Sequence, residues 1–227
     1  MLSIGFADGF AISWFLASWV IYTVLADSSK SGRPSLLRAM RAHRHEWMEK
    51  VVQRDQRIMD CYLLSTLANT NTFFASTTIL ILGGLIALLG TTEKVMTVVA
   101  DLPFVSKASE SVWELKILLL IVIFIYVFFK FSWSLRQFTF VSILVGSAPD
   151  KCKDNAIECA LFTKRASHIL SLAGNNFNSG LRGYYFGLAA LAWFIHPWLL
   201  VATSIGVILI LYRQEFRSST LRILIEK

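Results

Sequence analysis

The sequence ILLLIVIFIYVFF at residues 117–129 is the most apolar stretch of the chain and decides its fold class. Apolar character continues on both sides, so the segment 113–133 supplies the ~20 residues that a transmembrane helix needs. Of the 227 residues, 55% are hydrophobic and only 16% are charged, with a mean hydropathy of +0.57. Soluble domains carry about 25% charged residues. The composition therefore excludes a typical soluble enzyme and predicts a membrane protein.

Other apolar segments predict further spans at 4–25 and 70–91. The C-terminal apolar region, 183–212, is long for one helix and short for two, and His196-Pro197 lies at its middle. Because proline disfavours helix at the residue before it, a kink or a turn belongs there. The region is then either one kinked span or two short spans, 182–195 and 197–212.

Basic residues are distributed unevenly between the spans. Eight Lys or Arg residues lie between residues 27 and 72, whereas the segment 92–114 has two, against four acidic residues. The positive-inside rule places the basic segments in the cytoplasm and the N-terminus outside. The basic tail after Tyr212 stays cytoplasmic only if 183–212 crosses twice. This favours five spans, three long ones and a short C-terminal hairpin, and a cytoplasmic C-terminus.

The segments between the spans predict cytoplasmic helices at 35–60, 134–146 and 154–173. Residues 134–146 continue the third span as one long helix, and the Gly- and Asn-rich residues 174–180 predict a loop before the fourth span. The prediction is therefore an all-α polytopic membrane protein, formed by a single membrane domain with cytoplasmic amphipathic helices.

The segment 35–60 has an apolar face and a basic face. Arg38, Arg41 and Arg44 recur every third residue on the basic face, and Trp47 lies at its edge. Basic amphipathic helices of this kind bind anionic lipid headgroups. We expect these four side chains to contact headgroups; packing of the helix against another cytoplasmic helix is the alternative.

Polar residues gather at the predicted cytoplasmic ends of the spans. Ionisable groups at membrane depth are costly, so they tend to face one another, a cavity or the headgroups. Asp60 could pair with Arg136 or Arg182. The cluster forms either a polar vestibule for ions or a set of interfacial ion pairs that fixes helix depth. Its members are Arg54, Arg57, Asp60, Asn69, Asn71, Lys130, Arg136, Asn178 and Arg182.

The sequence predicts no catalytic, metal or cofactor site. The four histidines form no HExxH motif or i,i+4 pair, and the GxSxG and Gly-rich phosphate motifs are missing from the sequence. We therefore expect a protein that is not an enzyme and has no cofactor. The basic residues lie between apolar runs, which favours lipid headgroups over nucleic acid as the partner.

Small residues recur every fourth position in the predicted spans, as at Gly9, Ser13 and Ala17. Such rows let helices pack closely. Together with the Phe-rich third span, they predict a homo-oligomer or a complex with another membrane protein.

Several short sequences together resemble one family. They are RIMD (57–60), FFAST (73–77), DLPF (101–104), WELK (113–116), RQF (136–138), GLR (180–182) and RQEFRS (213–218). The set resembles the bacterial multi-pass membrane proteins of domain-of-unknown-function family 599, over nearly the whole chain. The resemblance implies a multi-pass membrane fold and supplies no catalytic residues.

These observations lead to one main hypothesis, an oligomeric protein of the bacterial inner membrane that forms or gates a pathway for ions or small polar solutes. A non-catalytic scaffold or accessory subunit of a larger membrane complex is the alternative. A lipid- or quinone-handling membrane enzyme is the third.

Overall fold

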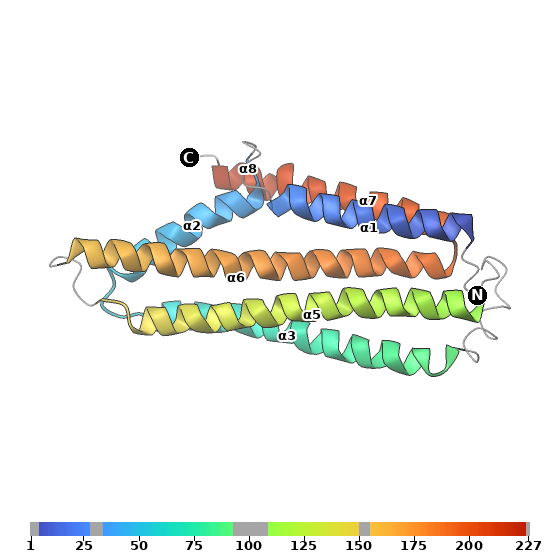
Figure 1. Ribbon diagram of the computed structural model, residues 1–227. Coiled ribbons are helices and arrows are strands. Elements are labelled where there is room, and N and C mark those ends of the chain that lie inside the picture. The colour runs from blue at the N-terminus through green and yellow to red at the C-terminus, as the bar shows by residue number, and fades with distance from the viewer. Residues whose placement is uncertain (1–4, 28–33, 93–108, 150–154, 226–227) are drawn as a thin grey trace. The chain divides into compact units, whose positions relative to one another are not determined.

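The computed structural model describes residues 5–27, 34–92, 109–149 and 155–225, and regular structure in these ranges is entirely helical (Figure 1). Three parts of the sequence predictions lie outside these ranges. They are residues 4 and 154, where two predicted segments begin, and most of the predicted outer segment 92–114. The elements are α1 (Phe6–Asp27), α2 (Leu36–Val51), α3 (Ile58–Leu89), α5 (Glu110–Gly146), α6 (Ala156–Leu191), the 3₁₀ turn η1 (Ala192–Phe194), α7 (Pro197–Phe216) and α8 (Ser219–Ile225).

Four stretches of helix among the described residues are long and apolar enough to cross a membrane. They are Phe6–Ala26, Ile58–Leu89, Glu110–Gly146 and Pro197–Ile225. This confirms the prediction of an all-α membrane protein. The five-span count stays a prediction, because the C-terminal half of α6 is not among the four stretches.

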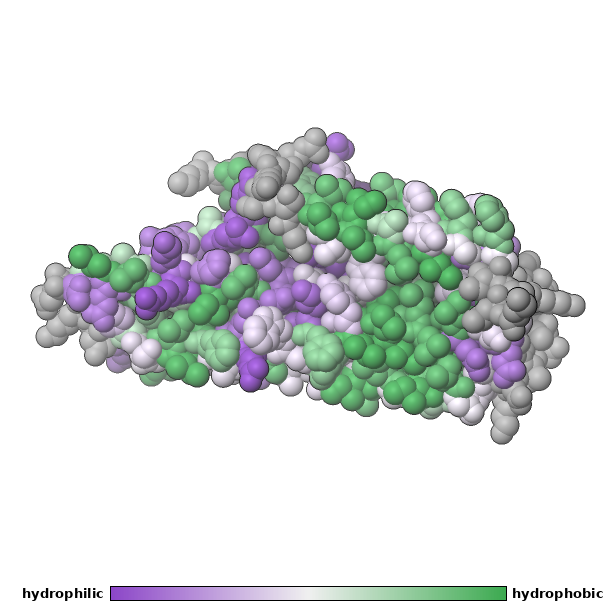
Figure 2. All heavy atoms as spheres, in the orientation of Figure 1, coloured by the Kyte–Doolittle hydropathy of each residue, from purple (hydrophilic) through white to green (hydrophobic). Residues whose placement is uncertain are grey.

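The chain divides into two compact units. The first unit comprises Met1–Gly32, Thr78–Val127 and Leu181–Gln214, and the second comprises Arg33–Thr77, Phe128–Gly180 and Glu215–Lys227. The helices α3, α5 and α6 therefore contribute residues to both units. Hydrophilic side chains gather over α2, which belongs to the second unit, whereas α1 and α7 of the first unit present a mainly apolar surface (Figure 2).

Aromatic contacts pack the first unit. Phe15 and Trp19 of α1 both lie against Phe186 of α6, with ring centroids 5.8 Å apart in each pair. Trp19 also meets Tyr126 of α5 edge to face at 5.4 Å. These geometries are the ones that aromatic quadrupoles favour. They fix α1, α5 and α6 against one another in this unit.

One lysine is buried among aromatic rings in the first unit. Lys116 is 1% exposed, and its Nζ donates to the carbonyl oxygen of Trp193 at 2.9 Å. The rings of Trp113, Trp193 and Phe194 have centroids within 6.0 Å of Nζ. The indole Nε1 of Trp193 donates to Asp8 Oδ1 at 2.8 Å, so Asp8 and Lys116 join three helical segments. Cation–π contacts of this kind gain strength when water is excluded.

The second unit has its own hydrophobic core, built by α2, α3, α5 and α6. Each helix contributes a side chain that is at most 1% exposed: Met48 from α2, Leu64 from α3, Val141 from α5 and Leu170 from α6. The backbone N–H of Arg38 donates to Ser35 Oγ, which caps the first turn of α2. At the other end of the chain, α8 packs against α2, and the Leu37 N–H donates to Glu215 Oε1 at 3.0 Å.

The prediction of a loop at 174–180 is wrong, because α6 is one continuous helix from Ala156 to Leu191. Its glycines serve tertiary contacts instead of a turn. A Cβ at Gly180 would lie 2.6 Å from a ring carbon of Phe131, and one at Gly183 would overlap a Val127 methyl. Glycine here permits close approach of α5, which local composition does not reveal.

Two other predicted boundaries differ from the structure. The segment 35–60 is not one helix: α2 ends at Val51, and α3 begins at Ile58 and continues through the predicted start at residue 70. The predicted span 182–195 ends early, because α6 stops at Leu191 and η1 follows. After this turn the Thr203 hydroxyl donates to the Ala189 carbonyl at 3.1 Å, so α7 folds back along α6.

The hydroxyl groups of four threonines in α3 donate hydrogen bonds to backbone carbonyls of the same helix. Thr66, Thr70, Thr72 and Thr77 each donate to the carbonyl four residues earlier, at 2.9–3.0 Å. Such back-bonding removes a free donor from the helix surface.

Replacing Gly180 with alanine tests the α5–α6 contact. Phe131 is fully buried between Phe74 and Phe177, so its ring cannot easily make room for the new methyl group. We expect Gly180→Ala to lower the unfolding free energy in detergent by about 1–3 kcal/mol. The control is Gly206→Ala, where a Cβ meets nothing within 4 Å and helix propensity predicts a neutral or stabilising effect. Equal stability of the two variants would contradict the contact.

Candidate functional site

Asp60, at the start of α3, is the buried centre of an ion pair. It is 0% exposed, and its Oδ1 accepts from Arg54 at 2.6 Å and from Trp47 Nε1 at 2.8 Å, both bonds falling within the second unit. Its partner is thus Arg54, six residues away, and not Arg136 or Arg182. The pairing is local because the break between α2 and α3 turns Arg54 back toward Asp60.

Arg57 has a different role, because it binds carbonyl groups. Its guanidinium donates to the carbonyl oxygens of Ala148 at 3.0 Å and of Pro149 at 2.6 Å. Its Nε donates to Val51 O at 3.3 Å. The last carbonyls of a helix lack partners within the helix. Arg57 therefore ties the end of α2 to the chain that follows α5.

A polar layer joins α5 and α6 inside the second unit. Asn176 accepts from Lys130 Nζ at 3.3 Å and donates to Gln137 Oε1 at 2.9 Å. One turn from these residues, Ser134 donates to the Ala173 carbonyl at 2.8 Å. Lys130 thus belongs to a bonded layer, as a charged residue inside a helical bundle requires.

The remaining members of the predicted polar cluster do not converge on one site. Asn69 and Arg136 are exposed, and Arg182 is buried in the first unit. Asn71 is 0% exposed, and neither atom of its amide has a hydrogen-bond partner. Asn178 lines a small cavity of the second unit.

The predicted headgroup residues of α2 divide between two cavities of the second unit. Arg38 and Arg41 line a groove of about 800 Å³ between α2 and α6. Arg44 and Trp47 line a smaller cavity of about 300 Å³ that also includes Asn178. Their contact with lipid stays a prediction.

Arg44 lies directly over a glycine of α6. A Cβ at Gly174 would fall 2.7 Å from the Arg44 Cζ, so a side chain at this position would force the guanidinium to shift. Burial, and to a smaller extent repulsion by Arg41, lowers the pKa of Arg44. Its Nη1 is buried without a hydrogen-bond partner. A desolvated cation of this kind attracts an anion.

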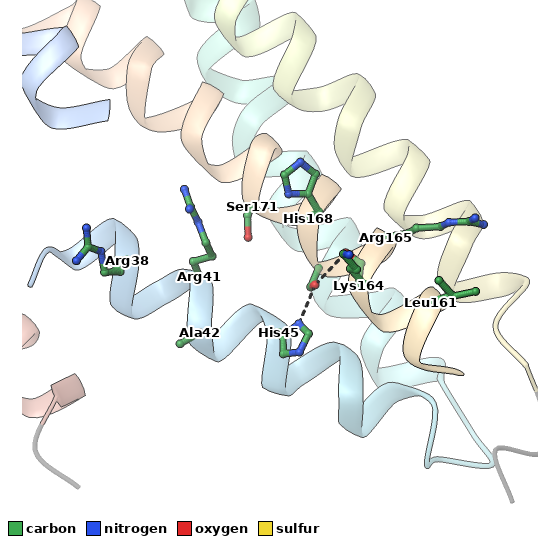
Figure 3. Close-up of a pocket in the computed structure, with 10 residues that line it drawn as sticks. Arg38, Arg41, Ala42, His45, Leu161, Lys164, Arg165, His168 and Ser171 are labelled. Carbon is green, nitrogen blue, oxygen red and sulfur yellow. Dashed lines mark hydrogen bonds between the residues drawn. The ribbon is translucent and has the colours of Figure 1, made fainter. Parts of the chain in front are cut away.

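The larger groove has basic walls from both helices. Arg38, Arg41 and His45 project from α2, and Lys164, Arg165 and His168 from α6 (Figure 3). The ring of His45 bonds Ser167 Oγ at 3.0 Å across the groove. The α6 wall was not predicted from the sequence, although the spacing of Lys164, His168 and Ser171 places them on one helical face.

The described residues contain no group of three or more His, Cys, Asp or Glu side chains that could hold a metal ion.

Removing Arg54 tests the ion pair. Asp60 would keep a buried charge with fewer donors, so Arg54→Ala should lower the unfolding free energy by about 1–3 kcal/mol. Chemical denaturation in detergent measures the change, and the exposed Arg136→Ala serves as the control. Adding Asp60→Asn to Arg54→Ala should restore part of the loss, because a neutral amide is cheaper to bury. A loss no larger than that of Arg136→Ala would contradict the pairing.

Comparison with known proteins connects this architecture to one family. Searches of curated proteins and of solved structures give no match to the chain. A family model does match residues 10–220, which include the long helices except the first four residues of α1, and the residues that line both cavities. The chain belongs to the family described as "Protein of unknown function, DUF599".

Proposed function

We propose that this protein assembles into oligomers in the bacterial inner membrane and forms or gates a pathway for ions or small polar solutes. The N-terminus would lie outside and the C-terminus in the cytoplasm, as the distribution of Lys and Arg predicts. The buried polar groups of the second unit would form the cytoplasmic mouth.

The observation that carries this proposal is the buried amide of Asn71. A buried polar group without a partner costs free energy, and folded proteins retain few of them without a functional reason. Asp60 and Thr78 lie on the same face of α3 and are also 0% exposed. The inward face of this long helix is therefore polar at three levels, and Asn71 offers a donor and an acceptor to a passing solute.

Assembly is supported by apolar side chains that the chain leaves exposed. On α5 in the second unit, Phe129, Trp133, Phe140 and Ile143 are 42–65% exposed and lie along one stripe of the helix. Exposed apolar patches of this kind mark interaction surfaces when they lie outside the bilayer and lipid contacts when they lie inside it. Gly9, in the predicted row of small residues of α1, also has open space where a Cβ would stand.

The same stripe favours a second candidate function, a non-catalytic scaffold or accessory subunit that holds another membrane protein. In that case a different protein covers the stripe, and the buried polar groups only hold the helices in position against one another. Flux measurements separate the two functions.

Flux into liposomes tests the pathway. Liposomes that contain the full chain should take up at least one of potassium, chloride and glycerol faster than empty liposomes. Asn71→Leu should reduce that flux by at least about tenfold, because it replaces the only amide on the inner face of α3. The variant should be as stable as the unmodified protein, because the substitution removes a buried polar group that has no hydrogen-bond partner. Asn69→Leu, on the exposed face of the same helix, is the matched control. Absence of flux for all three solutes, with a partner retained on purification, would support the scaffold instead.

Photo-crosslinking in native membranes tests assembly. Benzoylphenylalanine at Phe129, which is 65% exposed, should give crosslinked dimers or larger species. The same probe at Phe131, which is 0% exposed and two residues away, should give none. Only monomers from both positions would remove oligomerisation from the proposal.

A further inference from the structure

The groove between α2 and α6 concentrates positive charge. Four Lys or Arg residues and two His residues are among its lining residues, and no described lining residue is acidic. It lies entirely in the second unit, which also contains the basic amphipathic helix α2. Charge of one sign along the low-dielectric walls of a cleft attracts ions of the opposite sign.

The acidic residues of α2, Glu46 and Glu49, do not line the groove and contact neighbouring residues of the same helix. Glu46 accepts from Lys50 at 2.8 Å, and this bond lowers its pKa. Glu49 lies 3.4 Å from His45 Nε2. Arg41 meanwhile repels Arg44, one turn further along the helix. An anion bound beside Arg41 would relieve this repulsion.

A hydroxyl group in the groove also lacks a partner. Ser171 is 3% exposed, and its Oγ makes no hydrogen bond. Arg41 and Ser171 lie on opposite sides of the groove, on α2 and α6 (Figure 3). A hydroxyl donor between basic side chains matches a ligand with several acceptor oxygens.

We propose that this groove binds a phosphate group, held by Arg41 from α2 and by Lys164 and Ser171 from α6. Phosphate suits the groove because its oxygens accept from several donors at once, and guanidinium groups match its geometry. The source is either the headgroup of an anionic phospholipid or a soluble phosphate compound. The proposal does not depend on a transport function.

The test uses the full chain in a neutral detergent. Native mass spectrometry counts bound lipid during titration with phosphatidylglycerol or with zwitterionic phosphatidylcholine, and calorimetry follows inorganic phosphate. Phosphatidylglycerol should bind at least about tenfold more tightly than phosphatidylcholine. The double variant Arg41→Ala, Lys164→Ala should lose at least about tenfold in affinity, and Ser171→Ala a smaller factor. The control, Arg217→Ala with Arg222→Ala, removes the same charge from exposed residues outside the groove and should keep the affinity.

The outcomes also distinguish the two sources. Lipid binding that millimolar phosphate does not displace supports the proposal with a headgroup as the ligand. Saturable phosphate binding that Arg41→Ala, Lys164→Ala abolishes supports it with a soluble ligand. Equal losses in the two double variants would overturn the proposal, since they would reflect net charge alone. Equal affinity for the two lipids, with no binding of phosphate, would also overturn it.

Discussion

The close approach of α5 to α6 is the constraint on which the other contacts depend. Gly180, Gly183 and Gly187 leave space for Phe131, Val127 and Phe124. Once these side chains are seated on glycines, the register between the two helices is fixed. In the second unit, that register brings Lys130 to Asn176 and Ser134 to the Ala173 carbonyl. Because interiors are packed as tightly as crystals, a single added methyl group disturbs such a contact.

Much of the fold could be predicted because it depends on local composition. The apolar run at 117–129 and its continuation predict a helix well beyond membrane length, and α5 indeed extends from Glu110 to Gly146. The stretch 174–180 misleads for the opposite reason. Its glycines and asparagines suit a loop locally, but in the folded chain they make room for Arg44 and Phe131 or bond α5. That information lies in distant parts of the sequence.

The candidate site shows the same division. Helical spacing was enough to place Arg38 and Arg41 on one polar face, and both line the groove. Its second wall comes from Lys164 and Ser171, about 120 residues later, so pairing the walls requires the tertiary structure. The partner of Asp60 was missed because the break after Val51 redirects Arg54. Arg54 and Asp60 thus form an ion pair, Arg57 clamps carbonyl groups and Lys130 belongs to a bonded layer, whereas the buried amide of Asn71 has no hydrogen-bond partner.

The self-bonded threonines of α3 bear on how this protein meets bilayers of different thickness. A 32-residue helix is about 48 Å long, well beyond a hydrocarbon core of about 30 Å. Its N-terminal half carries Thr66, Thr70 and Thr72, whose hydroxyls already have acceptors. Immersing them costs less than the polar sequence suggests, because no donor is left unsatisfied. This part of α3 can therefore lie at headgroup depth or in the hydrocarbon, in a thin or a thick bilayer, without leaving these three hydroxyl donors unsatisfied.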